Sequence, residues 1–181
     1  MLKRIRGFTL IELLIVVAIL GILAALLIPN ALTAIQKAKQ KSTMKDITVI
    51  STAITDFITD NGIAPVSPSG PYTASSDIYG DLCPFYIKVL PITDQWGTGF
   101  NIWCGLAATE YGATDPGRDD FLVGSYGRDG VTDSSVFLDT DPEAGLYVVS
   151  KSEHFDYDLV MWNGSWIRAP RTSRTVAPPA L

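Results

Sequence analysis

A long apolar segment near the N-terminus dominates the hydrophobic pattern of the chain. Between Phe8 and Ile28 only Thr9 and Glu12 carry polar side chains, and residues 13–28 carry none. These 21 residues match the roughly 20 that a helix needs to cross the hydrocarbon core of a bilayer. The sequence therefore predicts an apolar helix over residues 8–28 that lies in a membrane or in an equally apolar protein assembly.

An amphipathic pattern replaces the apolar one after Pro29. Because proline lacks an amide proton, Pro29 either ends the membrane helix or removes one hydrogen bond from a longer helix. Beyond it, apolar side chains return at a spacing of about 3.6 residues: Ala34, Ala38, Ile47, Ile50, Ile54, Phe57 and Ile58. The renewed spacing favours a helix that continues over residues 29–61 and ends near Asn61-Gly62. We expect its apolar face over residues 47–58 to pack on a sheet.

Short segments with strand character fill the C-terminal domain, residues 62–170. Residues 62–85 are rich in proline, glycine and serine, which predicts a long loop. Six strands are predicted beyond it: Tyr86–Leu90, Phe100–Trp103, Phe121–Ser125, Leu146–Val149, Asp158–Trp162 and Trp166–Arg168. Short strands separated by turns indicate an antiparallel sheet, and a long helix packed against it gives an α+β fold. Residues 171–181 contain prolines and few apolar side chains, so they are expected to form a flexible tail.

Charge is distributed unevenly along the chain. Lys3, Arg4 and Arg6 precede the apolar segment, and no acid does. Positive residues flank the cytoplasmic ends of membrane segments, so the N-terminus is expected in the cytoplasm and the domain outside it. Without residues 1–7, the chain has 11 basic and 19 acidic side chains, a net charge of −8. This balance argues against binding to nucleic acid, which requires clustered lysine and arginine.

The positions of Gly7 and Glu12 distinguish this N-terminus from an ordinary signal peptide. A secretory signal has its small-residue cleavage site after the apolar stretch, whereas Gly7 precedes it. An uncleaved membrane anchor is the alternative, but a carboxylate in hydrocarbon is unfavourable and implies a partner and a function. Cleavage between Gly7 and Phe8 would create an α-amino group four residues from Glu12. The amine of one subunit could then neutralise the carboxylate of a neighbour and set the register between them.

The segment Gly7-Phe8-Thr9-Leu10-Ile11-Glu12-Leu13 resembles the prepilin motif of type IV pilins and type II secretion pseudopilins. The resemblance implies that a prepilin peptidase cleaves after Gly7 and methylates Phe8, that Glu12 supports assembly, and that the helix can loosen at Pro29 in the filament. It also implies a type IV pilin-like fold and a single pass through the bacterial inner membrane, followed by a periplasmic or extracellular filament. The implied partners are other copies of the chain, the peptidase, assembly-platform proteins and minor pilin-like proteins.

Three stretches of the domain are similar to the major pseudopilin of type II secretion. They are Leu90-Pro91 through Asp94-Gln95-Trp96-Gly97 to Phe100, Ser125-Tyr126-Gly127-Arg128-Asp129-Gly130, and Asp156-Tyr157-Asp158-Leu159 through Trp162. This similarity favours a structural subunit of a secretion pseudopilus, a filament that helps to export folded proteins. A major type IV pilin that serves adhesion, motility or DNA uptake is the close alternative. A membrane-anchored binding domain or enzyme is a third, and it predicts an uncleaved N-terminus.

The resemblance also implies a calcium site, because in that family the loop between the last two stretches binds Ca²⁺. It assigns the ligands to the side chains of Asp129 and Asp158 and the carbonyl of Tyr126, with Asp156 next. About 25 residues separate the two stretches here, where the family has a short link, and three acids in this insertion could substitute: Asp133, Asp139 and Asp141. Ca²⁺ takes six to eight oxygen ligands, which such a loop can supply. A solvated Asp-Gly turn is the simpler interpretation of the same residues.

Two cysteines and one histidine limit the other chemistry of the chain. Cys83 and Cys104 could form a disulfide in an oxidising compartment, or pack as two buried thiols. His154 lies between Ser152 and Asp156, but a catalytic triad is assembled in space and rarely from neighbours in sequence. Nucleophile elbow, phosphate loop and zinc-ligand spacings do not occur in the sequence. The sequence therefore predicts a protein that is not an enzyme.

Overall fold

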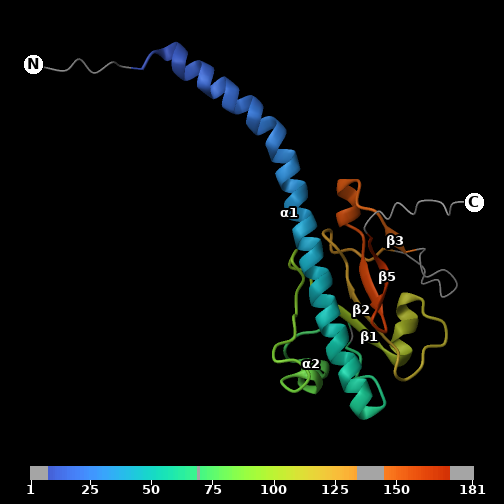
Figure 1. The fold of residues 1–181 in the computed structure, drawn as a ribbon. Helices are drawn as coiled ribbons and strands as arrows, with labels where there is room; N and C mark the ends of the chain where they lie inside the picture. Colours follow the sequence, from blue (N-terminus) through green and yellow to red (C-terminus); the bar gives the residue numbers. More distant parts are fainter. Residues whose placement is uncertain (1–7, 69, 134–144, 172–181) are drawn as a thin grey trace, which may run out of the picture. The chain divides into compact units, whose positions relative to one another are not determined.

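The computed structural model describes residues 8–68, 70–133 and 145–171. The chain divides into two compact units, Met1–Ala38 and Lys39–Leu181. Helix α1, Leu10–Asn61, contributes to both (Figure 1). The remaining helices and strands belong to the second unit.

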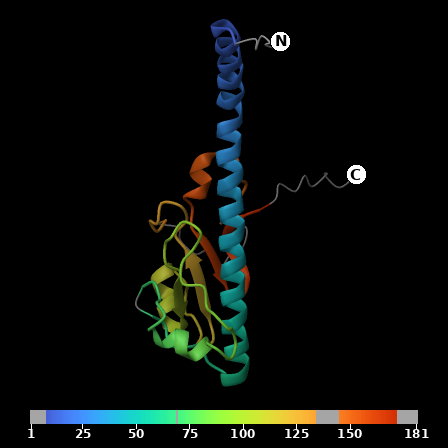
Figure 2. The ribbon, with the colours of Figure 1, turned by 90° about the vertical axis from the view of Figure 1, so that its left-hand side faces the viewer.

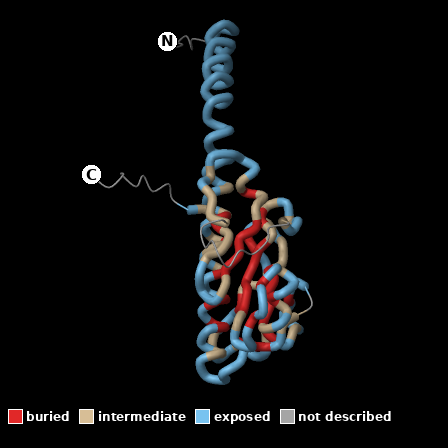
Figure 3. The backbone as a smooth tube through the Cα atoms, turned by 90° about the vertical axis from the view of Figure 1, so that its right-hand side faces the viewer, coloured by how far each residue is buried: buried red, intermediate tan, exposed pale blue. Residues whose placement is uncertain are grey.

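In the first unit, α1 exposes its apolar side chains along its whole length (Figure 3). The helix is long and apolar enough to cross a membrane, the one such helix in the part of the chain that the structure describes. It passes through Pro29 without a break. The side chains of Asn30 and Thr33 donate hydrogen bonds to the carbonyls of Leu26 and Pro29, at 3.3 and 3.0 Å. The predicted continuation of the helix beyond the proline is confirmed.

Helix α1 ends at the predicted stop. Gly62 follows its last residue with a φ of +73°, a left-handed conformation that favours glycine. The amide of Gly62 donates to the carbonyl of Ile58 at 2.7 Å, which closes the last turn. Asn61 also donates through its side chain to the carbonyl of Phe57 at 2.9 Å. Local hydrogen bonding therefore accounts for this boundary.

The second unit is a five-stranded sheet packed on the C-terminal half of α1, and the two lie side by side in both views (Figure 1, Figure 2). The strand order is β1-β2-β4-β5-β3. The strands are β1 (Asn101–Cys104), β2 (Phe121–Ser125), β3 (Leu146–Tyr147), β4 (Leu159–Trp162) and β5 (Ser165–Pro170). The α+β, pilin-like architecture predicted from the sequence is confirmed.

The period of two along the strands divides the core into two clusters. Ile47, Ile50 and Ile54 on α1 are each 0% exposed. They pack in one cluster with alternate residues of β1, β2 and β4: Ile102, Cys104, Phe121, Val123, Leu159 and Met161. The intervening residues pack in a second cluster with the 3-10 helix η1 (Gly105–Tyr111), and these are Trp103, Leu122 and Val160. The sheet is therefore covered on both faces.

Three predictions about the domain were wrong. The sheet is mixed, because β3 pairs with β5 in parallel. Residues 86–90 do not form a strand, and Tyr86 instead packs its ring edge-on against Phe57 with ring centroids 5.5 Å apart. The predicted loop over residues 62–85 contains helix α2, Asp77–Leu82, which buries Ile78 and Leu82 in the core.

A second 3-10 helix, η2 (Ser152–Phe155), was not predicted. The predicted tail lies outside the described residues beyond Arg171.

The substitution Ile50→Ala is expected to destabilise the second unit by about 2–5 kcal/mol, because it removes a fully buried side chain from the helix–sheet contact. Denaturant unfolding of the full-length chain in detergent, followed by tryptophan fluorescence, measures this change. Val49→Ala is the matched control, since the neighbouring Val49 is 38% exposed. Equal losses for the two variants would contradict the proposed packing.

Candidate functional site

Thr9 and Glu12 form a capping box at the start of α1. Oε2 of Glu12 accepts hydrogen bonds from the amide of Thr9 at 2.9 Å and from its hydroxyl at 2.6 Å. The amide of Glu12 donates in return to the hydroxyl of Thr9 at 3.3 Å. Thr-x-x-Glu is the sequence signature of this cap. In a single chain the carboxylate therefore has partners within its own helix, in addition to the amine of a neighbouring subunit that the sequence predicts.

The two processing residues, Gly7 and Phe8, lie on either side of the N-terminal limit of the described residues. Phe8 is exposed, and Gly7 lies outside the described residues. Nothing in the arrangement of the single chain tests cleavage after Gly7, the pairing of Glu12 with an amine, or a looser helix at Pro29. These three remain predictions.

Asp94 joins two of the stretches that carry the resemblance. Its Oδ1 accepts hydrogen bonds from the amides of Trp96 and Thr98, both at 2.9 Å, which closes the turn. Its Oδ2 accepts from the hydroxyl of Ser125 in β2 at 2.7 Å. Asp94 is buried, so these bonds compensate for the loss of water around its charge. The Asp-x-Trp-Gly turn is thus tied to the strand that leads into Tyr126 and Gly127.

The same turn is tied to α1 through the residue after Asp94. The amide of Gln95 donates to the hydroxyl of Thr43 at 3.3 Å, and its side chain donates to Asp46 at 3.1 Å. Thr43 is fully buried. The turn therefore connects the helix to the sheet, and this link involves pairs of residues about 50 positions apart that local sequence patterns do not show.

Gly127 allows the loop after β2 to pass close to the segment before β4. A Cβ at this position would lie 2.6 Å from the carbonyl oxygen of Asp156 and 2.7 Å from that of Tyr157, both too close for a side chain. Its φ of +69° independently favours glycine. The second and third stretches are thereby brought into contact across the long insertion.

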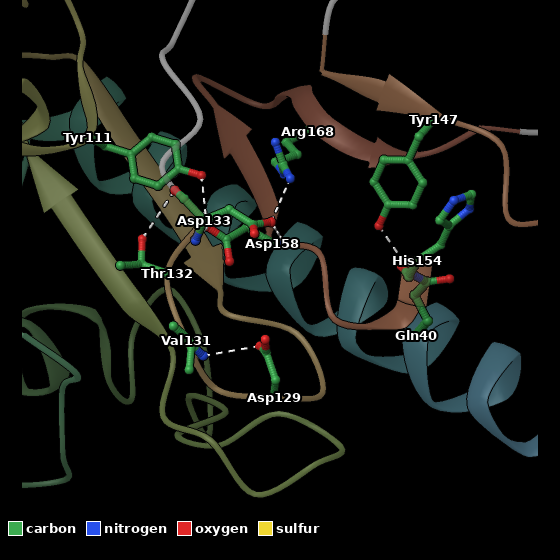
Figure 4. A network of polar contacts seen from close by, with 10 residues as sticks. All are labelled: Gln40, Tyr111, Asp129, Val131, Thr132, Asp133, Tyr147, His154, Asp158 and Arg168. Carbon is green, nitrogen blue, oxygen red and sulfur yellow. Dashed lines mark hydrogen bonds and ion pairs between the residues drawn. The ribbon is translucent and has the colours of Figure 1, made fainter. Parts of the chain in front are cut away.

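Asp133 and Asp158 form the centre of the candidate metal site, on the sheet face away from α1 (Figure 4). Oδ2 of Asp158 accepts hydrogen bonds from the hydroxyl of Tyr111 at 3.1 Å and the amide of Asp133 at 3.0 Å. The amide of Asp158 donates to Oδ2 of Asp133 at 3.1 Å. Nη2 of Arg168 lies 2.5 Å from the same Oδ2. The insertion, β4 and β5 therefore meet at two neighbouring carboxylates.

Asp158 is the electrostatically unusual member of this cluster. It is 0% exposed, and its Oδ1 is buried without a hydrogen-bond partner among the described residues. Burial raises its pKa to about 7, against the opposing effects of the Asp133 amide, the Tyr111 hydroxyl and the positive charge of Arg168. A charged Asp158 thus requires a cation or further donors nearby. Its free oxygen is the feature of the cluster that fits a hard metal ion.

The other predicted ligands are placed differently. Asp156 forms a two-bond ion pair with Arg128, with Nε–Oδ1 and Nη2–Oδ2 distances of 2.7 and 2.8 Å. Asp129 is exposed, accepts a hydrogen bond from the amide of Val131 at 3.1 Å, and lies apart from Asp158 in the view of Figure 4. Asp139 and Asp141 lie outside the described residues. Within the described ranges, no group of three or more His, Cys, Asp or Glu side chains could hold a metal ion.

Neither the cysteines nor the histidine forms a reactive arrangement in the described part of the chain. Cys83 and Cys104 are free thiols, and burial raises the pKa of Cys104 to about 12. His154 stacks on Tyr157, and its Nδ1 lies 2.8 Å from the carbonyl oxygen of Val148. The carbonyl of His154 instead accepts a hydrogen bond from the buried Gln40 at 3.3 Å, which anchors η2 to α1. These contacts are structural.

Comparisons with known proteins agree with this geometry. Residues 2–28 match the model of the prokaryotic N-terminal methylation motif. Together with the long helix packed on a small sheet, the motif places the chain in the class of pilin-like proteins. Its relatives identify the branch of that class, because the chain belongs to the type II secretion system core protein G family, whose members are the major pseudopilins.

Three relatives named type II secretion system core protein G illustrate the similarity. The protein of Dickeya chrysanthemi is 31% identical over 159 residues, which cover 84% of this chain and 92% of the relative. That of Vibrio cholerae serotype O1 is 32% identical, with coverages of 71% and 86%. That of Pseudomonas aeruginosa is 33% identical, with coverages of 74% and 93%. No solved structure matches the chain significantly.

The substitution Asp94→Ala is expected to destabilise the second unit by about 3 kcal/mol, because it leaves two amides and the Ser125 hydroxyl without their acceptor. Thermal unfolding of the full-length chain, followed by near-ultraviolet circular dichroism, detects the loss. Asp81→Ala serves as the control, since Asp81 is an exposed residue of α2. A midpoint that is the same for both variants would show that the turn is not a structural tie.

Proposed function

We propose that this chain is the main structural subunit of a type II secretion pseudopilus. The observation that carries the proposal is the exposed apolar surface of α1 in the first unit, which runs along the helix from Leu10 to Ile35. Such a surface is stable only in lipid or against other apolar helices. Membership of the core protein G family supports a filament as the final environment.

Assembly would replace lipid around this helix with the same helix of other copies. Lipid tails are as apolar as the leucine and isoleucine side chains, so the gain comes from close packing rather than from a hydrophobic effect. Processing between Gly7 and Phe8 supplies the amine that pairs with Glu12 of a neighbour. An unpaired charge at this depth is strongly unfavourable, so the pairing selects one register.

The proposed pathway follows from the charge pattern and the motif. The subunit enters the inner membrane with its N-terminus in the cytoplasm and its domain in the periplasm. The prepilin peptidase then cleaves and methylates it. Assembly-platform and minor pilin-like proteins add the subunit to a filament that helps to export folded proteins.

We further propose that the cluster around Asp158 holds Ca²⁺. The buried Oδ1 without a partner and the neighbouring carboxylate of Asp133 support this proposal, since Ca²⁺ prefers carboxylate oxygens. Asp129 and the carbonyl of Tyr126 belong to the same loop and are the further ligands that the family resemblance assigns. A bound ion would neutralise the acids and hold this loop against β4.

The substitution Glu12→Leu is expected to abolish filaments while the chain is still inserted and processed. Mass spectrometry of the membrane-extracted protein should give a chain that begins at methylated Phe8 in both the wild type and the variant. Electron microscopy of sheared filaments should detect them only in the wild type. Thr33→Val is the control, because it also removes a polar group from α1. Filaments formed by the Glu12→Leu variant, or an intact Met1 in the wild type, would contradict the proposal.

Removal of calcium is expected to lower the thermal midpoint of the full-length chain by roughly 8 °C, if the ion is bound at about 100 times its dissociation constant. The measurement compares excess Ca²⁺ with excess EGTA. Asp158→Asn should remove most of this difference, whereas Asp77→Asn, in the exposed part of α2, should keep it. An unchanged wild-type midpoint, with no metal found by mass spectrometry, would refute the calcium site.

A further inference from the structure

A buried carboxylate beside a second, partly exposed one requires positive charge nearby: Asp158 is 0% exposed, and the side chain of Asp133 is 32% exposed. Asp158 is fully buried, and Asp133 contacts it through a reciprocal pair of amide-to-carboxylate hydrogen bonds. Moving a carboxylate out of water is strongly unfavourable unless a cation or hydrogen-bond donors replace the water. The two hydrogen bonds that Asp158 accepts at Oδ2 replace only part of its hydration, since Oδ1 has no partner in the described structure.

The chain supplies a cation of its own at this point. Arg168, in β5, has a side chain that is only 18% exposed, and its Nη2 lies 2.5 Å from Oδ2 of Asp133. Its positive charge also lowers the pKa of Asp158, in opposition to the effect of burial. Figure 4 shows the guanidinium directed at the two acids from the β5 side, with Tyr111 on the opposite side of the cluster.

Packing holds Arg168 in this position. Its guanidinium carbon lies 5.2 Å from the centre of the Tyr157 ring, a cation–π contact. Its Nε is buried and has no acceptor among the described residues. Arg168 is partly buried, and it leaves one N–H donor without an acceptor while its guanidinium bonds to Asp133. This arrangement favours neutralisation of the acid over complete hydrogen bonding of the arginine.

We infer that Arg168 is a built-in counter-cation of the Asp133–Asp158 pair, and that it competes with a divalent cation for the same carboxylates. The inference rests on the proposed calcium site. Each cation neutralises the acids, so either can stabilise the loop, but a guanidinium bonded to Asp133 must move before that oxygen can bind a metal. The apparent affinity for Ca²⁺ is then reduced by the fraction of molecules in which Arg168 occupies the carboxylate.

Competition predicts effects of opposite sign for the single substitution Arg168→Gln. In EGTA the variant should unfold roughly 5–10 °C below the wild type, because the acids lose their only counter-charge in the described cluster. In excess Ca²⁺ this deficit should largely disappear. The affinity for Ca²⁺, measured by titration calorimetry with calcium chloride on the full-length chain in detergent, should rise by at least about fivefold.

Two further variants separate charge from packing. Arg168→Lys keeps the charge without the planar fork, and should be intermediate in both measurements. Lys151→Gln removes the same charge from an exposed site before η2, and should change neither. If Arg168→Gln cannot be purified without calcium, it is prepared in Ca²⁺ and transferred to EGTA. Asp133→Asn supplies an independent measure, because in its background Arg168→Gln should have a clearly smaller effect in EGTA, limited to the charge of Asp158.

Several results would overturn the inference. Equal destabilisation of Arg168→Gln with and without Ca²⁺, at unchanged affinity, would make Arg168 a packing residue only. A weaker affinity in the variant would mean that Arg168 helps to organise the metal site. If neither the wild type nor the variant binds Ca²⁺, both the competition and the calcium proposal fail. The filament proposal would still stand on the Glu12 experiment, which does not depend on the metal.

Discussion

The contact between the apolar stripe of α1 and the sheet is the interaction on which the domain depends. Ile47, Ile50 and Ile54 are fully buried there, on a helix segment whose threonines and valine favour helix only weakly. Packing therefore stabilises this half of α1 more than local propensity does. The same contact fixes where Gln40 and Thr43 lie, and through them the positions of η2 and of the turn at Asp94.

Two buried aspartates illustrate two ways of tolerating a charge inside this domain. Asp94 accepts hydrogen bonds on both oxygens from its own turn and from Ser125, so it closes a structural link without a metal or a basic partner in the contacts described. Asp158 is bonded on one oxygen only and lies beside a second acid. Hydrogen bonds to both oxygens make Asp94 a structural link, whereas Asp158 keeps one buried oxygen without a partner among the described residues.

The parts of this fold that local patterns determine could be predicted from the sequence. The amphipathic continuation of α1 follows from side-chain periodicity, and its end follows from the turn residue Gly62. The apolar segment and the strands β1, β2 and β4 follow from apolar runs, which in the strands are short and bounded by turns. The parallel pairing of β3 with β5 could not be predicted, because both strands are short and their register is set by distant neighbours. Helix α2 could not be predicted either, because it is short, lies in a proline-rich stretch and buries only two side chains in the core.

In the candidate site too, the sequence predicted some residues, whereas contacts between distant residues could not be predicted. Asp129 and Asp158 were predicted from resemblance, and the structure places Asp158 in the cluster. Asp156 has an arginine partner that sequence spacing could not reveal, since Arg128 lies 28 residues away. Arg168 carried no signal as part of the site, because it follows the last resembling stretch and no motif connects β5 with the acids. An arginine between the apolar residues Ile167 and Ala169, at the end of a predicted strand, is the sequence feature that could have been used.

The capping box at the start of α1 alters the energetic starting point for filament growth. Oε2 of Glu12 already accepts two hydrogen bonds from Thr9. The carboxylate of a single subunit in the membrane is therefore already hydrogen-bonded. In the proposed filament a neighbouring amine would have to replace these contacts, and the net driving force would be smaller than the attraction between two isolated ions. Random association of two subunits in the bilayer would therefore release little free energy. Polymerisation would then depend on the machinery that aligns them, which restricts growth in both place and time.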